Sequence, residues 1–214
     1  MTIHIGLDLS LVSPGVSVLD TDTGLWKLYG FVQRVREQRF SSSTCPNETT
    51  SIVLLPAIPT TATNEERYEH IRHHIVDIIM SPFSNAPDVV VGIESYAFGA
   101  KNSGSSYKLQ ELGGVLKHSI WRTYPKWRRD IIPPTQWKKK TLGNGRATKA
   151  DVIAFVRSHG PCVPLLDLLG LVPAKNGDIP CPAQDLADAV CICLSTTMPT
   201  TVVVQSKKRR RANP

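Results

Sequence analysis

The sequence predicts an α/β protein whose mixed central sheet begins with an antiparallel hairpin and carries helices on both faces. Residues 3–9 alternate Ile and Leu with small or polar residues, which indicates a strand with one apolar face. Residues 88–95 (DVVVGIES) contain β-branched residues without alternation, which is typical of a strand covered on both faces. Segments with helical spacing separate the later strands, so strands and helices are expected to alternate.

The first strand leads into the predicted hairpin. Residues 15–20 and 26–32 flank the turn-rich sequence TDTG at 21–24. The next segment, residues 33–63, is rich in Ser, Thr and Pro and is expected to form a surface insertion. Within it, SIVLLP at 51–56 fits a short strand.

Helices are predicted in four places. The first covers residues 64–80, because Thr63 and Glu66 form a capping box before apolar residues at helical spacing. Its histidines are expected to be exposed rather than metal ligands, since no carboxylates share their face; they are His70, His73 and His74. The remaining elements are helices over 106–121, 148–160 and 182–195, a short strand in 130–140 and a Pro- and Gly-rich loop over 159–183.

Composition bounds the class of protein. The 214 residues, 41% of them hydrophobic, suffice for one domain, expected over residues 1–196, with a basic flexible tail over 197–214. The five cysteines form no C-x-x-C pair, which argues against a disulfide framework or a zinc ribbon and favours a reducing compartment. Neither a signal pattern nor a membrane-spanning segment is recognisable, so a soluble protein without membrane contact is expected.

Positive charge is concentrated in two segments. The formal net charge is +7, and residues 126–149 carry eight basic groups against the single acid Asp130. The tail adds KKRRR at 207–211. Such segregation indicates a surface that binds a polyanion, because phosphate neutralisation releases counterions; a solvated charged face is the alternative. The tail fits a nuclear-import signal, a DNA-gripping arm or a solubilising end.

Four carboxylates stand where such a sheet can bring them together. Asp8 lies in the first strand and Glu94 ends the central strand. Asp185 and Asp188 lie three residues apart on one face of the last helix. Gathered carboxylates repel one another unless cations lie between them, so convergence predicts a divalent metal, and oxygen-only ligands favour Mg²⁺ or Mn²⁺. Taken singly, each acid fits a turn or helix cap equally well.

Two such ions, about 4 Å apart, are the usual means of in-line displacement at phosphorus. The same residues resemble a known family, the RuvC-type Holliday-junction resolvases of the RNase H-like superfamily. The most specific feature is Lys-Lys, Gly-Asn-Gly-Arg and Lys between a strand and a helix. The matching blocks are GLDLS at 6–10, VVGIES at 90–95 with LQELGGVLK at 109–117, PPTQWKKKTLGNGRATKADV at 133–152 and QDLADAVCI at 184–192.

The resemblance implies an RNase H-like fold in which the four carboxylates bind two Mg²⁺ ions, or Mn²⁺, and catalyse DNA hydrolysis. It implies that Lys138 and Lys149 lie near the scissile phosphate, with Lys149 taking part in catalysis. The remaining basic residues of this block are expected to hold the DNA backbone, with solvent exposure alone as the alternative; they are Lys139, Lys140 and Arg146. Phe98, or else Tyr96, is expected to stack on opened bases.

The family also implies a homodimer that nicks a four-way junction symmetrically. Leu112, Gly113 and Leu116 of the 106–121 helix would supply the dimer contact, although core packing explains them equally well. The long segment 33–63 and the basic tail depart from the bacterial pattern and suggest a viral, phage or organellar relative. We therefore expect an intracellular, DNA-associated protein, in a nucleus or at a viral replication site.

Other functions remain open from sequence. A different RNase H-like nuclease, cutting branched DNA or hybrids, would share the carboxylates but not need the Gly-Asn-Gly-Arg block. A non-catalytic junction-binding protein would have no reason to keep mutually repelling acids together. Sugar-kinase-like ATPases also begin with an Asp-bearing strand and hairpin, but this chain lacks their second domain and phosphate loops.

Overall fold

A computed structural model describes residues 1–31, 43–44, 50–95, 104–159 and 182–198 of the chain. Outside these residues lie nearly all of the predicted tail, most of the predicted 159–183 loop and parts of the 33–63 segment. In the described part, no helix is both long enough and apolar enough to cross a bilayer.

The core of the fold is a mixed sheet of seven strands in the order β4-β5-β3-β2-β1-β6-β7. The predicted hairpin is confirmed, since β2 pairs antiparallel with both β1 and β3. The predicted central strand is β6, which lies parallel to β1 on one side and to β7 on the other. The strands are β1 (Thr2–Asp8), β2 (Gly15–Asp20), β3 (Leu25–Phe31), β4 (Ser43–Thr44), β5 (Thr50–Leu55), β6 (Asp88–Glu94) and β7 (Arg128–Ile132).

Part of the 33–63 segment belongs to the sheet. The short strand expected at 51–56 is β5, and it pairs parallel with β3 from Trp26 to Phe31. Ile52 and Leu55 are buried in it. The expectation of a surface insertion is therefore wrong for residues 50–55, because β5 extends the sheet and contributes to both of its apolar faces.

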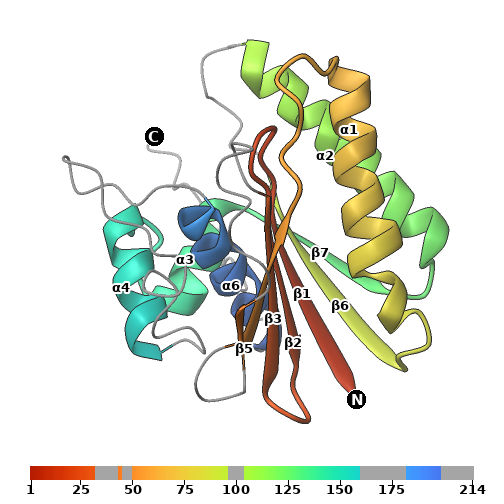
Figure 1. Cartoon of the computed structure of the whole chain (residues 1–214). Coiled ribbons are helices and arrows are strands. Elements are labelled where there is room, and N and C mark those ends of the chain that lie inside the picture. Colours follow the sequence, from red (N-terminus) through yellow and green to blue (C-terminus); the bar gives the residue numbers. More distant parts are fainter. Residues whose placement is uncertain (32–42, 45–49, 96–103, 160–181, 199–214) are drawn as a thin grey trace, which may run out of the picture.

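Helices cover both faces of the sheet (Figure 1). On one side lie α1 and α2, and on the other lie α3, α4 and α6. Residues 134–142 form a helix, where a continuing strand was expected from sequence. Pro134 starts this helix and Gly143 ends it with a left-handed φ of 76°, which are the usual proline and glycine positions. The helices are α1 (Asn64–Arg72), α2 (Gly104–Thr123), α3 (Pro134–Leu142), α4 (Lys149–His159) and α6 (Ala183–Thr197).

The first predicted helix is confirmed, with a change of helix type at its middle. Both capping-box bonds are present: the Glu66 amide donates to Thr63 Oγ1 at 3.2 Å, and the Thr63 amide donates to Glu66 Oε2 at 2.8 Å. After α1, the segment η2 (His73–Ile79) continues as a π-helix, and a 3₁₀ turn, η3 (Ser81–Phe83), follows.

Only one of the three histidines in this region is exposed as expected. His73 faces solvent, whereas His70 and His74 are half-buried. Their rings lie 4.3 Å apart between centroids, and both meet the ring of Phe31 edge-on. They are part of the packing of α1 and η2 against Phe31 of β3.

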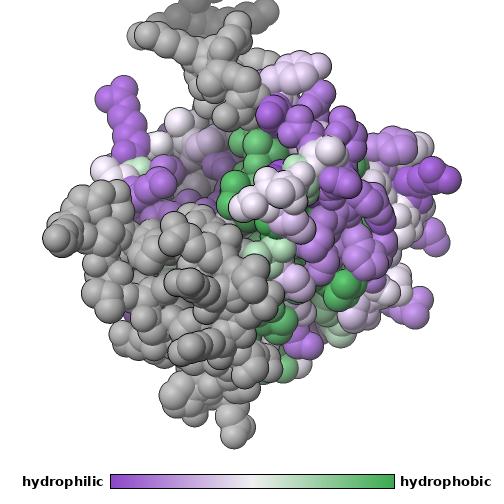
Figure 2. All heavy atoms as spheres, turned by 45° about the horizontal axis from the view of Figure 1, so that its top comes forward, coloured by the Kyte–Doolittle hydropathy of each residue, from purple (hydrophilic) through white to green (hydrophobic). Residues whose placement is uncertain are grey.

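Helix α2 turns its leucines into the protein core. Leu112, Leu116 and Ile120 are fully buried against the apolar face of β1 and β6. The two leucines and Gly113, which is also buried, therefore cannot supply a dimer contact, and the alternative of core packing holds. Among the coloured residues on the face shown in Figure 2, most are hydrophilic and the hydrophobic ones form small patches.

Helix α6 lies unusually close to the other face of the sheet. A Cβ on Gly6 of β1 would overlap the Ala189 carbonyl oxygen, and a Cβ on Gly15 of β2 would overlap the Asp185 carbonyl. The hydroxyl of Ser17 donates to the same Ala189 carbonyl at 2.7 Å. Small residues on the strands thus let the backbone of α6 rest on the sheet.

Replacing Gly6 tests this close approach. Gly6→Ala would place a methyl group 2.6 Å from the Cys193 amide nitrogen, so α6 must shift, and we expect a loss of about 1–3 kcal/mol in the free energy of unfolding. Gly114→Ala is the matched control: no atom lies within 4 Å of its Cβ, and Ala favours a helix by about 0.5–1 kcal/mol over Gly. Urea unfolding should give effects of opposite sign; equal effects would contradict the packing argument.

Candidate active site

Parallel pairing of β1 and β6 brings the first two carboxylates together. Leu7 is paired with Ile93, so Asp8 and Glu94 follow directly at the same end of neighbouring strands. Asp8 is only 8% exposed, while Glu94 is half-buried. A buried carboxylate therefore stands beside a second one at the edge of the sheet.

Helix α6 adds the other two carboxylates at the same end. Asp8 pairs with Gly15 across the hairpin, and Gly15 lies against the backbone of Asp185 in the first turn of α6. Asp188 follows one turn later and is also half-buried. The structure thus brings together all four carboxylates named from sequence.

Burial and the neighbouring carboxylates shift the pKa of two members of this group. Burial raises the pKa of Asp8 well above its usual value, and repulsion from Glu94, Asp188 and Asp185 raises it further. Burial likewise raises the pKa of Asp188 to about 6, against the opposing effect of a hydrogen bond from Gln184. Negative charge at this end of the sheet is costly without a counter-charge.

The oxygen atoms of these four side chains are of the type that binds a divalent cation. All four groups are carboxylates, and hard cations such as Mg²⁺ take oxygen ligands. As the side chains stand, however, no three His, Cys, Asp or Glu residues in the described part of the chain are arranged to hold one ion. Closing around an ion therefore requires these side chains to turn, and the metal site stays a prediction.

The basic residues of the Gly-Asn-Gly-Arg block take different positions. Lys138 has its Nζ bonded to the Ala147 carbonyl at 2.9 Å, and its charge lowers the pKa of Asp188 against the effect of burial. Lys140 donates to the Ser195 carbonyl at 3.3 Å, which links α3 to α6. The others are exposed to solvent: Lys139, Arg146 and Lys149.

Two residues that hold the carboxylates were not identified from sequence. The indole Nε1–H of Trp137 donates to Glu94 Oε1 at 3.0 Å, and Gln184 Nε2 donates to Asp188 Oδ2 at 3.2 Å. Gln184 could have been found, because it lies four residues before Asp188 on the same helix. Trp137 could not have been found, because the sequence predicts a strand over residues 130–140, which include it.

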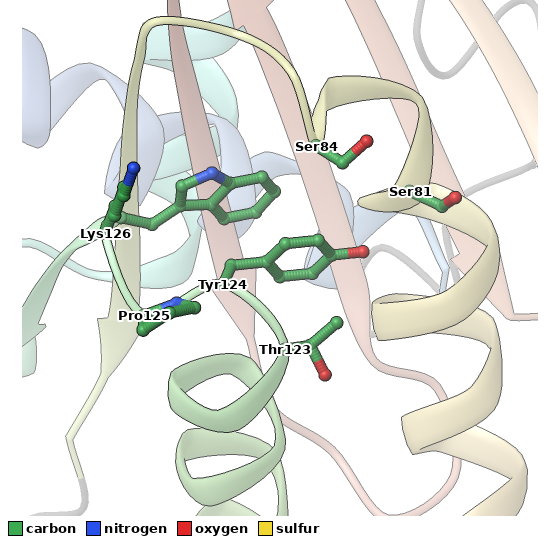
Figure 3. A pocket seen from close by; sticks show the side chains of 7 residues that line it. Ser81, Ser84, Thr123, Tyr124, Pro125 and Lys126 are labelled. Atoms are coloured by element: carbon green, nitrogen blue, oxygen red, sulfur yellow. The ribbon is translucent and has the colours of Figure 1, made fainter.

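The aromatic residues expected to stack on bases, Phe98 and Tyr96, lie outside the described residues. The pocket in Figure 3 belongs to the opposite end of the sheet, next to the residues that precede β6. Its volume is about 440 Å³, and the Tyr124 and Trp127 rings stack in it at 3.9 Å between centroids. No site carboxylate lines it; its lining is Ser81, Ser84, Thr123, Tyr124, Pro125, Lys126 and Trp127.

Removing the buried charge of Asp8 is expected to stabilise the metal-free protein. Asp8→Asn keeps the shape of the side chain and removes one repelling group, so the free energy of unfolding in EDTA should rise by about 1 kcal/mol. Mg²⁺ should raise the unfolding temperature of the wild type, because a ligand of the folded state stabilises it, and should do so less for Asp8→Asn.

Thermal and urea unfolding with and without Mg²⁺ measure both effects. Asp88→Asn is the matched control, because Asp88 is an exposed carboxylate at the other end of β6. A wild type whose stability does not respond to Mg²⁺ would count against the metal site.

This chain is similar to known proteins in its fold, whereas searches with family models and among curated proteins find no match. No protein-family model matches this sequence, and a search of curated proteins also gives no match. Among solved structures, Thermus thermophilus RuvC is similar with a TM-score of 0.54 and 20% identity, over 92% of this chain and 93% of that chain. T. thermophilus RuvC in complex with Holliday junction substrate is similar over the same shares, with a TM-score of 0.54 and 18% identity. The chain therefore has the RNase H-like α/β fold of RuvC.

Proposed function

We propose that this protein is a structure-selective endodeoxyribonuclease that resolves four-way DNA junctions by paired symmetric nicks, using two divalent metal ions. The observation that carries this proposal is the meeting of four carboxylates from β1, β6 and α6 at one end of a RuvC-like sheet. The Holliday junction in one similar structure suggests the substrate class.

In this proposal the four carboxylates hold two Mg²⁺ ions, with Mn²⁺ an alternative. Ions of this kind activate water for attack on phosphorus and stabilise the leaving oxygen. Lys138 lies close enough to act on Asp188, so its ammonium group is suited to orient a phosphate at the carboxylates. Lys149 begins α4 and is exposed, and we assign it to charge stabilisation at the scissile phosphate.

The backbone of the basic loop between α3 and α4 is held by several contacts. The amide of Arg146 donates to Asn144 Oδ1 at 3.0 Å, and a Cβ on Gly145 would lie 2.7 Å from the Thr135 carbonyl oxygen. Lys138 closes the loop through its bond to Ala147. With its backbone fixed, the loop can direct exposed Arg146 at DNA phosphates, next to exposed Lys139 of α3. Binding should then depend on salt. Lys140 is half-buried and lies against α6, so we assign it a weaker part in holding the DNA backbone than exposed Lys139 and Arg146.

A cleavage assay on synthetic DNA tests the proposed reaction. With Mg²⁺, the wild type should cut a four-way junction into two nicked duplexes and leave linear duplex largely intact. Glu94→Gln should still bind the junction, because the basic residues are unchanged, but should cut it roughly a hundredfold more slowly or worse. Glu65→Gln, which alters an exposed glutamate of α1, should cut normally.

Two outcomes would contradict the proposal in different ways. Equal cutting of linear duplex or of an RNA–DNA hybrid would indicate a general RNase H-like nuclease. Junction binding without any cutting by the wild type, in Mg²⁺ or Mn²⁺, would indicate a non-catalytic binding protein.

Paired nicks need two active sites, and we propose that a second copy binds the outward face of α2. This face carries large hydrophobic side chains that the core does not cover: Tyr107 is 66% exposed and Trp121 is 54% exposed. His118 lies beside Trp121 at 6.0 Å between ring centroids.

A charge placed on this face should separate the two copies. Trp121→Glu would put a carboxylate into the proposed contact and should shift the protein from dimer to monomer in sedimentation equilibrium. Ile78→Glu is the control, because Ile78 is 46% exposed but lies on η2. A monomeric wild type at high micromolar concentration would contradict the dimer, as would equal dissociation by both substitutions.

A further inference from the structure

Trp137 is a core residue that reaches the candidate active site. Its side chain is 1% exposed and packs in the apolar cluster with Ile132, Val190 and Cys191. Its Nε1–H nevertheless points at Glu94, with 3.0 Å between Nε1 and Oε1. An indole suits this double role, because it fills space with an apolar body and offers a single donor.

Glu94 has the longest side chain of the four carboxylates. A glutamate loses about 1.5–2 kcal/mol of side-chain entropy when it is fixed, more than the shorter aspartates lose. Asp8 is held by its burial in β1, and Asp188 accepts a hydrogen bond from Gln184. A bond from a neutral donor to a charged acceptor is stronger than one between neutral groups, so Trp137 can hold Glu94 in one orientation.

The position of Trp137 is in turn set by α6. Thr141 Oγ1 donates to the Cys191 carbonyl at 3.1 Å, and Lys140 donates to the Ser195 carbonyl at 3.3 Å. Both bonds tie α3 to the helix that carries Asp185 and Asp188. Glu94 on the sheet is therefore oriented through α3 relative to the two aspartates on α6.

We propose that Trp137 is a positioning residue for cation binding: it holds one oxygen of Glu94 and leaves the other to face a divalent ion shared with the aspartates. This rests on the metal-binding part of the proposed function, but not on the choice of DNA substrate. Hydrogen-bond partners of metal ligands commonly change metal affinity by about 10–100-fold when removed.

Binding of Mn²⁺ to the full-length protein without DNA tests the proposal. Trp137→Phe keeps an aromatic ring in the core and removes the donor, and should weaken Mn²⁺ binding about tenfold or more in calorimetric titration. Trp26→Phe is the matched control, because Trp26 is 7% exposed in the same apolar cluster but lies on β3. It should bind Mn²⁺ as the wild type does.

A double-mutant cycle distinguishes positioning from packing. If Trp137 acts through Glu94, adding Trp137→Phe to Glu94→Gln should cause little further loss of Mn²⁺ affinity. An equal loss in both backgrounds would assign Trp137 to packing alone and overturn the proposal, as would wild-type affinity in Trp137→Phe. A wild type that binds Mn²⁺ but cuts no junction would reject the proposed function and leave the positioning role standing.

A second measurement needs no substitution, in case Trp137→Phe fails to fold. The chain has four tryptophans, and each gives one indole N–H signal in a ¹H–¹⁵N spectrum. Titration with Mg²⁺ should shift the Trp137 signal more than those of Trp26, Trp121 and Trp127. An unmoved Trp137 signal, with or without Mg²⁺ binding elsewhere, would overturn the proposal.

Discussion

The close approach of α6 to the sheet is the constraint on which the site depends. Gly6 and Gly15 let the helix backbone lie against β1 and β2, and this contact places Asp185 and Asp188 over the ends of the strands. The fold brings like charges together there, and burial first and repulsion second raise the pKa of Asp8, so its ionised form is costly. Apolar packing on both faces of the sheet must offset that cost.

That cost is reduced by donors around the carboxylates, which also limit how the acids can move. Trp137 and Gln184 each give one hydrogen bond to a carboxylate, and the charge of Lys138 favours ionised Asp188. Each donor comes from a helix rather than a loop, so the support is as rigid as the core. A cation would relieve the repulsion between these carboxylates, but some of their side chains must turn from their present orientations to surround it.

The places of Asp8 and Glu94 on their strands could be predicted from sequence, because hydrophobic periodicity is a local signal. Alternation placed Asp8 on a strand face, and an unbroken β-branched run placed Glu94 at the end of a central strand. The Trp137–Glu94 bond joins residues 43 apart, and the Pro-Pro sequence before Trp137 was taken for part of a strand. Leu112 could not be placed from sequence for a different reason. An apolar stripe on a helix is compatible with packing against the protein's own core and with packing against a partner, and here Leu112 is buried in the core.

The contacts of α3 suggest why acids and basic residues lie on neighbouring helices. Lys140 and Thr141 bind successive turns of α6, and Lys138 fixes the loop that carries Arg146. The basic loop therefore cannot move far without α6, and α6 cannot move without displacing its carboxylates. A phosphate held by the loop would keep a constant distance from the acidic end of the sheet, which in-line displacement requires. Helix α3 therefore fixes the basic loop that carries Arg146 and the carboxylates of α6 relative to each other.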